Sequence, residues 1–213
     1  MNRKIKKYFD AFPIYAMTAE DLSFSHDNIS DVEDMLKAGV KVIQYREKEK
    51  SFLEMYNQCL KIREMTREAG AILIIDDFAD LAVAVGADGV HIGQEDMPIE
   101  AVRRVTGDDF IIGVSTHAPD QAVDAVKRGA DYIGVGPLYE THTKKNVCAP
   151  VGLEYLDWVV ENIDIPFVAI GGIKKHNLNE VFSHGAKCAC LVTGIVGSKD
   201  IQDEIKKLCE IIN

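Results

Sequence analysis

The sequence predicts an α/β fold, a single-domain (β/α)8 TIM barrel, and three observations support this prediction. Eight short apolar segments typical of strands alternate with helical patterns, which favours a parallel sheet. Five helix-to-strand junctions contain a glycine, which can end a helix in the left-handed conformation before the next strand begins. No linker interrupts the composition, so we expect one domain over residues 1–213, with residues 1–12 as an N-terminal lead-in.

The expected strands are short runs rich in apolar and β-branched residues. In order, they are Pro13–Met17, Val40–Tyr45, Ala71–Ile75, Gly89–Ile92, Phe110–Val114, Tyr132–Val135, Phe167–Ile170 and Cys188–Val192. The helical patterns between them are Ile29–Ala38, Phe52–Ala69, Met97–Val105, Pro119–Lys127, Leu153–Asn162, Leu178–Ser183 and Ile201–Ile212. The glycines at helix ends are Gly39, Gly70, Gly86, Gly129 and Gly185. An open, doubly wound sheet is the alternative. The count of eight strands favours the barrel, and no Gly-x-Gly-x-x-Gly follows the first strand.

Composition narrows the range of functions. The chain is 47% hydrophobic and 27% charged, as in soluble globular proteins, and no apolar run is long enough to span a bilayer. The formal net charge of −10 argues against a nucleic-acid partner but allows a small anion in a local cationic pocket. Five cysteines without framework spacing indicate a cytoplasmic protein. Cys188 and Cys190 are expected to be buried hydrophobes, with metal ligation as the alternative, and Cys148 lies in a loop.

The second expected strand ends in polar residues at alternate positions, which lie on the same face of the strand. Side chains alternate faces along a strand, so Val42, Gln44, Arg46 and Lys48 share one face as far as the strand continues. An amide and two cations are costly inside a closed core but suit a strand end that opens into an anion pocket. The alternative is a solvated edge strand with ordinary surface charges.

Acidic residues follow the next two strands. Asp76 and Asp77 end the third strand, and Asp96 follows the fourth. Carboxylates at adjacent strand ends repel one another unless a cation lies between them, and oxygen-only ligands indicate Mg²⁺. Helix capping by Asp77 and Asp96 is the alternative. His91, between them in the sequence, is expected to pack or to form hydrogen bonds.

The later loops suit a second anion. Gly134 and Gly136 share a bare strand face that leaves volume for a ligand or allows close packing at a barrel corner. The loop Leu138–Lys145 is polar, with hydroxyls and a cation. Glycines and backbone N–H groups after the seventh and eighth strands form the usual phosphate cradle of this fold. A cationic, Mg²⁺-binding site beside a neutral cradle predicts a metal-bound diphosphate that departs while a phosphorylated second substrate attacks carbon.

These motifs together resemble the thiamine-phosphate synthase family from about Ile14 to the C-terminus. The segments that carry the resemblance are Gln44-Tyr45-Arg46-Glu47-Lys48, Asp77, Gly89-Val90-His91-Ile92-Gly93-Gln94-Glu95-Asp96, Gly113-Val114-Ser115, Gly134-Val135-Gly136-Pro137, Thr141-His142-Thr143-Lys144 and Ile170-Gly171-Gly172-Ile173. The resemblance implies a cytoplasmic transferase that joins hydroxymethylpyrimidine diphosphate to thiazole phosphate and releases diphosphate. The family reaction passes through a pyrimidine carbocation. No nucleic-acid or membrane partner is expected, and a homo-oligomer stays compatible with the sequence.

The resemblance also implies site residues. The catalytic positions are Arg46, Lys48, Ser115 and Lys144. The Mg²⁺ ligands are Asp77 and Asp96. The substrate-binding positions are Gln44, Tyr45, Arg46, Glu47, Lys48, Asp76, Ser115, Thr141, His142, Thr143, Lys144, Gly171, Gly172, Val192 and Thr193.

Two positions depart from the family pattern. Asp76 stands where asparagine is usual, and a carboxylate would repel diphosphate unless it is protonated or turned towards a metal or a cation. Thr193 stands where serine is usual and keeps the hydroxyl. Two alternatives to the synthase remain, a thiazole tautomerase-like isomerase and a non-catalytic thiamine-precursor-binding paralogue. The synthase is favoured because an isomerase has no diphosphate to bind, whereas this chain retains Arg46, Lys48, Asp77, Asp96 and Lys144.

Overall fold

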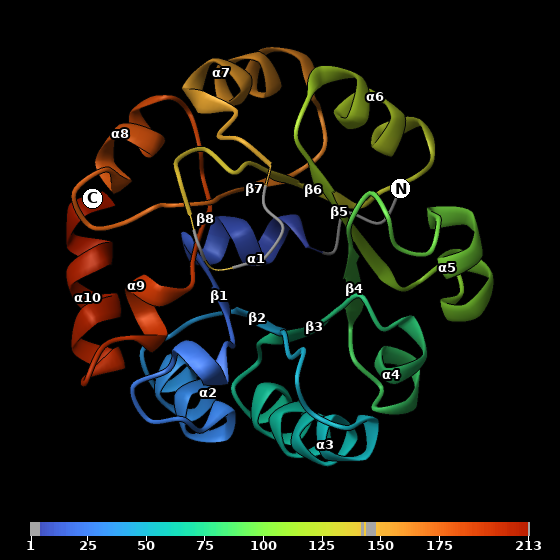
Figure 1. Ribbon diagram of the computed structural model, residues 1–213, viewed down its shortest axis with the longest axis vertical. Helices are drawn as coiled ribbons and strands as arrows, with labels where there is room; N and C mark the ends of the chain where they lie inside the picture. The colour runs from blue at the N-terminus through green and yellow to red at the C-terminus, as the bar shows by residue number, and fades with distance from the viewer. Residues whose placement is uncertain (1–4, 142, 144–147, 213) are drawn as a thin grey trace.

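The eight strands form a closed parallel barrel in chain order, as Figure 1 shows from one end. This computed structural model describes residues 5–141, 143 and 148–212. The strands are β1 (Ile14–Met17), β2 (Val42–Tyr45), β3 (Ile72–Asp76), β4 (Gly89–Ile92), β5 (Ile111–Thr116), β6 (Tyr132–Val135), β7 (Phe167–Ile170) and β8 (Ala189–Leu191). Pairing of β1 with both β2 and β8 closes the sheet, so the predicted barrel is confirmed and the open sheet is excluded.

Helices surround the barrel in a ring (Figure 1). They are α2 (Asn28–Lys37), α3 (Phe52–Glu68), α4 (Ala79–Ala84), α5 (Ile99–Thr106), α6 (Pro119–Lys127), α7 (Gly152–Asn162), α8 (Leu178–Ser183), α9 (Thr193–Val196) and α10 (Ile201–Ile212). The seven predicted helices are confirmed to within two residues at each end, whereas α4, α9 and a short helix in the expected lead-in were not among them. All five predicted junction glycines have the left-handed φ that this role requires.

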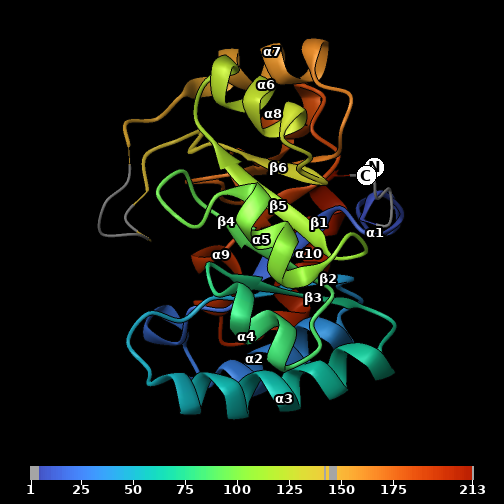
Figure 2. The same cartoon turned by 90° about the vertical axis from the view of Figure 1, so that its right-hand side faces the viewer.

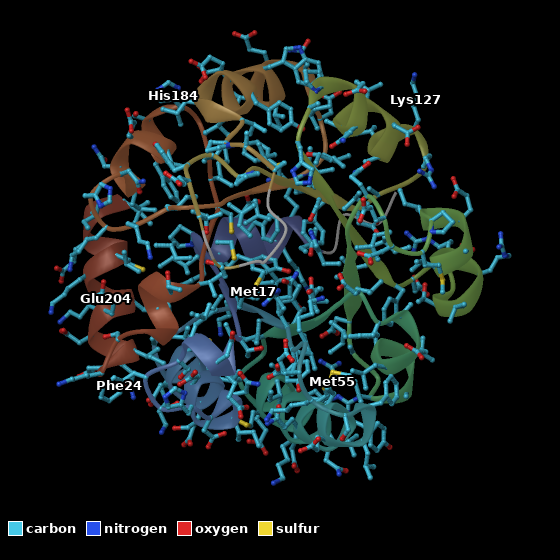
Figure 3. The ribbon with its side chains drawn as sticks, viewed as in Figure 1. Met17, Phe24, Met55, Lys127, His184 and Glu204 are labelled. Carbon is cyan, nitrogen blue, oxygen red and sulfur yellow. The ribbon has the colours of Figure 1, made fainter. Side chains whose placement is uncertain are left out.

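Apolar side chains pack in two separate regions. The larger one lies between the strands and the surrounding helices and includes Val32, Ile43, Leu73 and Ile112. The smaller one fills the barrel with alternate residues of the strands. Its members are Tyr15, Met17, Val42, Ile72, Ile74, Ile111, Tyr132, Val168, Cys188 and Cys190, with Ile5 and Phe9 added from the N-terminal segment. Cys188 and Cys190 are thus buried, as the sequence predicts. In Figure 3, Met17 lies near the middle of the ring, whereas Lys127, His184 and Glu204 lie at its rim.

The expected lead-in contains a short helix, α1 (Lys6–Ala11), that closes one end of the barrel. Figure 2 places α1 at one end of the structure. Phe9 is 4% exposed, and its ring packs edge-on against Tyr15 and Tyr132, with centroids 6.2 and 5.6 Å away. Tyr132 is the first residue of β6, so α1 covers the amino ends of the strands. The carboxyl ends, where the polar residues cluster, form the other end.

In the described part of the chain, no helix is both long and apolar enough to cross a membrane.

Candidate active site

Arg46 and Lys48 leave the end of β2 and meet the acids that end β3. Thr18, fully buried after β1, fixes the backbone of Arg46 from both sides. Its hydroxyl accepts a hydrogen bond from Arg46 N at 2.8 Å and donates one to Arg46 O at 3.1 Å. Lys48 pairs with both Asp76 and Asp77. The predicted convergence of cations and carboxylates at adjacent strand ends is therefore present in the structure.

Asp76, the departure from the family pattern, is turned towards the cations. Its side chain is 3% exposed, and Oδ2 lies 3.2 Å from Lys48 Nζ and 3.6 Å from Arg46 Nε. Burial alone would lower the pKa of Lys48, but the charges of Asp76 and Asp77 and their hydrogen bonds outweigh it and raise that pKa. The carboxylate of Asp76 is therefore directed at the two cations expected to bind diphosphate.

Asp77 and Asp96 face each other across the gap between β3 and β4. Asp77 has a φ of 63°, the left-handed region that Asp tolerates better than most residues, and its N–H donates to His91 O at 2.8 Å. Asp96 accepts a hydrogen bond from Gly93 N at 2.6 Å. The helix-cap alternative does not describe this arrangement, because Phe78 and Pro98 are the N-cap residues of α4 and α5.

The two facing carboxylates fit a hard cation. The pKa of Asp96 is raised first by desolvation and then by the charge of Asp77, and the Gly93 hydrogen bond and Lys48 only partly offset this. A divalent cation between the two acids would relieve their repulsion. Within the described ranges, no group of three or more His, Cys, Asp or Glu side chains could hold a metal. A pair of carboxylates completed by substrate phosphate oxygens is, however, a common mode of Mg²⁺ binding.

Tyr45 and Glu47 point away from this cluster. Tyr45 OH donates to Gln58 Oε1 of α3 at 2.7 Å. Glu47 accepts from Asn28 Nδ2 of α2 at 3.1 Å and from the backbone N–H of Lys48 at 2.9 Å. The alternation of the strand explains this, since odd-numbered residues here face the helices. The contacts of both residues hold the loop that carries Lys48, and the structure does not bring their side chains to the strand-end cluster.

A chain of buried polar side chains crosses the barrel below the strand ends. Gln44 Nε2 donates to Tyr15 OH at 2.9 Å, and Tyr15 OH lies 3.0 Å from Tyr132 OH. His91 joins this chain to Ser115, with Nδ1 3.0 Å from Tyr132 OH and Nε2 2.9 Å from Ser115 Oγ. Burial raises the pKa of both tyrosines, so both stay neutral hydroxyls. Gln44 and Ser115, two predicted substrate contacts, are thus held by one network.

The bare face of β6 is filled by protein. A Cβ on Gly134 would lie 3.3 Å from the His91 ring, and one on Gly136 would lie 2.1 Å from Ile170 O. The sequence left two explanations for these glycines, space for a ligand and close packing at a barrel corner. The structure favours close packing at both positions. Three residues of this region, Tyr15, Thr18 and Tyr132, were not predicted from the sequence. The available signal was a side chain with a hydroxyl group within or next to an apolar strand.

The loops after β6, β7 and β8 form the second part of the site. Gly171 and Gly172 have φ values of 96° and 66°, and a side chain on either would collide with the chain at Pro137–Glu140. Tyr139 N donates to Gly171 O at 3.0 Å, which joins the first two loops. Thr141 Oγ1 and Thr143 Oγ1 lie 3.1 Å apart. Val192 and Thr193 are both half-buried after β8. The predicted residues His142 and Lys144 lie outside the described residues.

The comparisons with known proteins agree with this geometry. The sequence model of the thiamine monophosphate synthase family matches residues 14–195. The thiamine-phosphate synthase of Pelotomaculum thermopropionicum is 58% identical over 200 residues, which cover 94% of this chain and 92% of the relative. That of Caldicellulosiruptor saccharolyticus is 54% identical over 204 residues, covering 96% and 92%.

Solved structures agree as well. The thiamine phosphate pyrophosphorylase of Pyrococcus furiosus superposes with a TM-score of 0.87 at 35% identity and covers 97% of both chains. A 3-hexulose-6-phosphate synthase, with a TM-score of 0.68 at 17% identity, shares the fold alone. The family match spans most of the barrel, and the relatives align over nearly their full length. The chain therefore belongs to the thiamine monophosphate synthase family.

Proposed function

We propose that this chain is a transferase that joins hydroxymethylpyrimidine diphosphate to thiazole phosphate, giving thiamine phosphate and diphosphate. In this reaction the C–O bond between the pyrimidine methylene and the diphosphate breaks, and the diphosphate leaves with the electron pair. The lone pair of the thiazole nitrogen then forms the new C–N bond. The observation that carries the proposal is the convergence of Arg46, Lys48, Asp77 and Asp96 at adjacent strand ends. No protein nucleophile is needed, and the substrates are small molecules.

Arg46 and Lys48 bind the departing diphosphate and stabilise its charge as the bond breaks. Asp77 and Asp96 hold Mg²⁺, which when bound supplies further neutralisation of the leaving group. Lys144 is assigned to the pyrimidine substrate on the resemblance alone. Asp76 sets how strongly the two cations are already engaged before substrate arrives.

Gln44 and Ser115 orient the pyrimidine from opposite sides of the barrel. The chain through Tyr15, Tyr132 and His91 fixes both groups, so their positions need no reorganisation when substrate binds. The backbones at Gly171-Gly172 and Val192-Thr193, with Thr141, His142 and Thr143, bind the thiazole phosphate. Tyr45 and Glu47 position the loop that carries the cations. The buried thiols Cys59 and Cys188 are compatible with a cytoplasmic setting.

One assay tests the function. The chain is incubated with both substrates and Mg²⁺, and thiamine phosphate and diphosphate are followed by chromatography. We expect equal amounts of the two products, and none after chelation of the metal. Isomerisation of a thiazole substrate without pyrimidine would favour the tautomerase instead. Absence of product from this chain, with activity restored by Asp76→Asn, would reject the synthase function for the sequence as it stands.

A second measurement tests the metal assignment. Asp96→Ala is expected to lower Mg²⁺-dependent turnover by at least roughly 100-fold, because the leaving group loses its neutralising cation. Thiazole phosphate binding, measured by calorimetry, should stay within about threefold, since the cradle lies on other strands. The neighbouring exposed Glu95→Ala is the matched control and should retain activity. Equal loss of turnover and thiazole phosphate binding in Asp96→Ala would show that the metal is misplaced.

A further inference from the structure

The loop after β7 carries a cation that the expected neutral phosphate cradle does not include. Lys174 is half-buried, and its Nζ donates a hydrogen bond to Thr193 Oγ1, the hydroxyl at the end of β8. The contact joins the two loops that form the cradle. It brings a full positive charge to a site for which the sequence indicated backbone N–H groups and hydroxyls only.

Lys174 differs from two other lysines at this end of the barrel, the exposed Lys48 and the half-buried Lys50. Lys48 pairs with Asp76 and Asp77, and Lys50 pairs with Glu20 at 2.7 Å. Among the described residues, no carboxylate lies within 4.0 Å of Lys174 Nζ. In a chain with a net charge of −10, an ammonium group without a carboxylate partner is well suited to an anionic ligand.

The position of Lys174 is fixed by its own loop. Asn177 is 8% exposed and bonds to both sides of the turn. Its Oδ1 accepts from Lys174 N at 2.7 Å, and its Nδ2 donates to Gly172 O at 3.1 Å. The lysine backbone is thereby tied to the glycine pair of the cradle, so the ammonium is held beside the cradle.

We propose that Lys174 binds the phosphate of the thiazole substrate and sets the preference for the phosphorylated form, which rests on the function proposed above. Thr193 Oγ1 accepts a hydrogen bond from Lys174, so its own proton remains available to donate to a phosphate oxygen. A phosphomonoester is close to a dianion at neutral pH, and a charge-assisted bond to it is stronger than a bond from a neutral donor. The unphosphorylated thiazole alcohol offers no such charge. Lys174 therefore contributes to discrimination between the two.

The test compares Lys174→Met with Lys175→Met as the matched control. Lys175 is the adjacent lysine, but it is exposed and lies 3.8 Å from Glu204. Calorimetry measures the affinity of each variant for thiazole phosphate and for the thiazole alcohol, and kinetics measures KM for each substrate. We expect Lys174→Met to weaken thiazole phosphate binding by roughly 10- to 100-fold. Affinity for the alcohol, KM for the pyrimidine diphosphate, and all values for Lys175→Met should stay within about threefold.

Lys174→Arg should restore most of the phosphate affinity, because it keeps the charge. Affinity of Lys174→Met for thiazole phosphate within about threefold of the original would overturn the proposal, and so would equal losses for the phosphate and the alcohol. The binding experiment needs no turnover, so it separates the two proposals. The chain could form no thiamine phosphate and still bind thiazole phosphate more tightly than the thiazole alcohol, with this preference lost in Lys174→Met. That result would reject the synthase function but support the proposed role of Lys174.

Discussion

Replacing Asp76 by Asn tests whether the unusual carboxylate competes with substrate for the cations. Asp76 is buried beside Arg46 and Lys48, and its Oδ2 lies 3.2 Å from Lys48 Nζ. The substitution keeps the size of the side chain and removes one negative charge. It also supplies an amide that can donate a hydrogen bond to a diphosphate oxygen, which a carboxylate cannot do.

The expected change in binding free energy follows from the distance between Asp76 and Lys48 and from the exposure of the Lys48 side chain. Two unit charges 3.2 Å apart interact by about 5 kcal/mol at an effective dielectric constant of about 20. Lys48 is 36% exposed and keeps its pairing with Asp77, so solvent and the second acid screen most of this interaction. We therefore expect a net gain of about 1–2 kcal/mol in pyrimidine diphosphate binding, a roughly 5- to 30-fold lower KM. Arg46 loses a buried partner, so the melting temperature should fall.

The assay measures kcat and KM for pyrimidine diphosphate at saturating Mg²⁺ and thiazole phosphate, with the melting temperature of each variant. Asp77→Asn is the matched control, since it removes the same charge one residue along the chain. It should lose Mg²⁺-dependent turnover instead of gaining affinity. A higher KM in Asp76→Asn, or a loss of activity equal to that of Asp77→Asn, would refute the reasoning and would make Asp76 a metal ligand.

Three further predictions concern stability and reactivity. Phe9→Ala should lower the free energy of unfolding by about 3–5 kcal/mol in denaturant titrations, because the ring is 4% exposed against the tyrosines of the barrel interior. A wild-type value would show that α1 does not close the barrel. The two hydrogen bonds from Arg128, at 2.8 Å each, lower the pKa of Glu100 from 4.5 to about 2, so they stabilise the fold above about pH 4.5 and less as the pH falls towards 2. Glu100→Gln should therefore have a lower melting temperature at pH 7, and a gap that widens on acidification would contradict this sign. Cys148 is exposed, whereas burial raises the pKa of Cys59 to about 12, so a thiol reagent at pH 8 should label Cys148 first by mass spectrometry of peptides. Earlier labelling of Cys59 would show that its site opens to solvent.

Most of the fold could be predicted because its signals are local. Strand and helix patterns alternate, and a glycine marks five of the junctions. The α-helices that escaped prediction are short, with six residues in α1, six in α4 and four in α9. Helix α1 buries only Phe9 within its own span, which is too little for a periodic pattern. Its role depends on contacts with β1 and β6, which lie apart in the sequence and meet only in the closed barrel.

The part of the site on β2 could be predicted, because side chains along a strand alternate between its two faces. Gln44, Arg46 and Lys48 followed from alternation, and the same rule places Tyr45 and Glu47 on the helix side, although the family motif groups all five. The hydrogen-bonded chain across the barrel was not predictable, because Tyr15 and Tyr132 are 117 residues apart. The cation at the second anion site was also missed, since nothing near Lys174 in the sequence shows that it reaches Thr193.

The two proposed anion sites differ in the contacts of their cations, and this difference predicts that only diphosphate binding depends on metal. At the first site, Arg46 and Lys48 lie against Asp76, Lys48 also pairs with Asp77, and Asp96 lies beside Asp77, so carboxylates engage both cations before substrate arrives. On the function proposed above, a divalent cation held by Asp77 and Asp96 would offset the charge of these acids and favour diphosphate binding. At the second site, the contact of Lys174 Nζ within the described part of the chain is the Thr193 hydroxyl, so we expect a monophosphate to bind there without metal. We therefore expect the metal to act on the substrate whose bond breaks, and the nucleophilic substrate to bind independently of it.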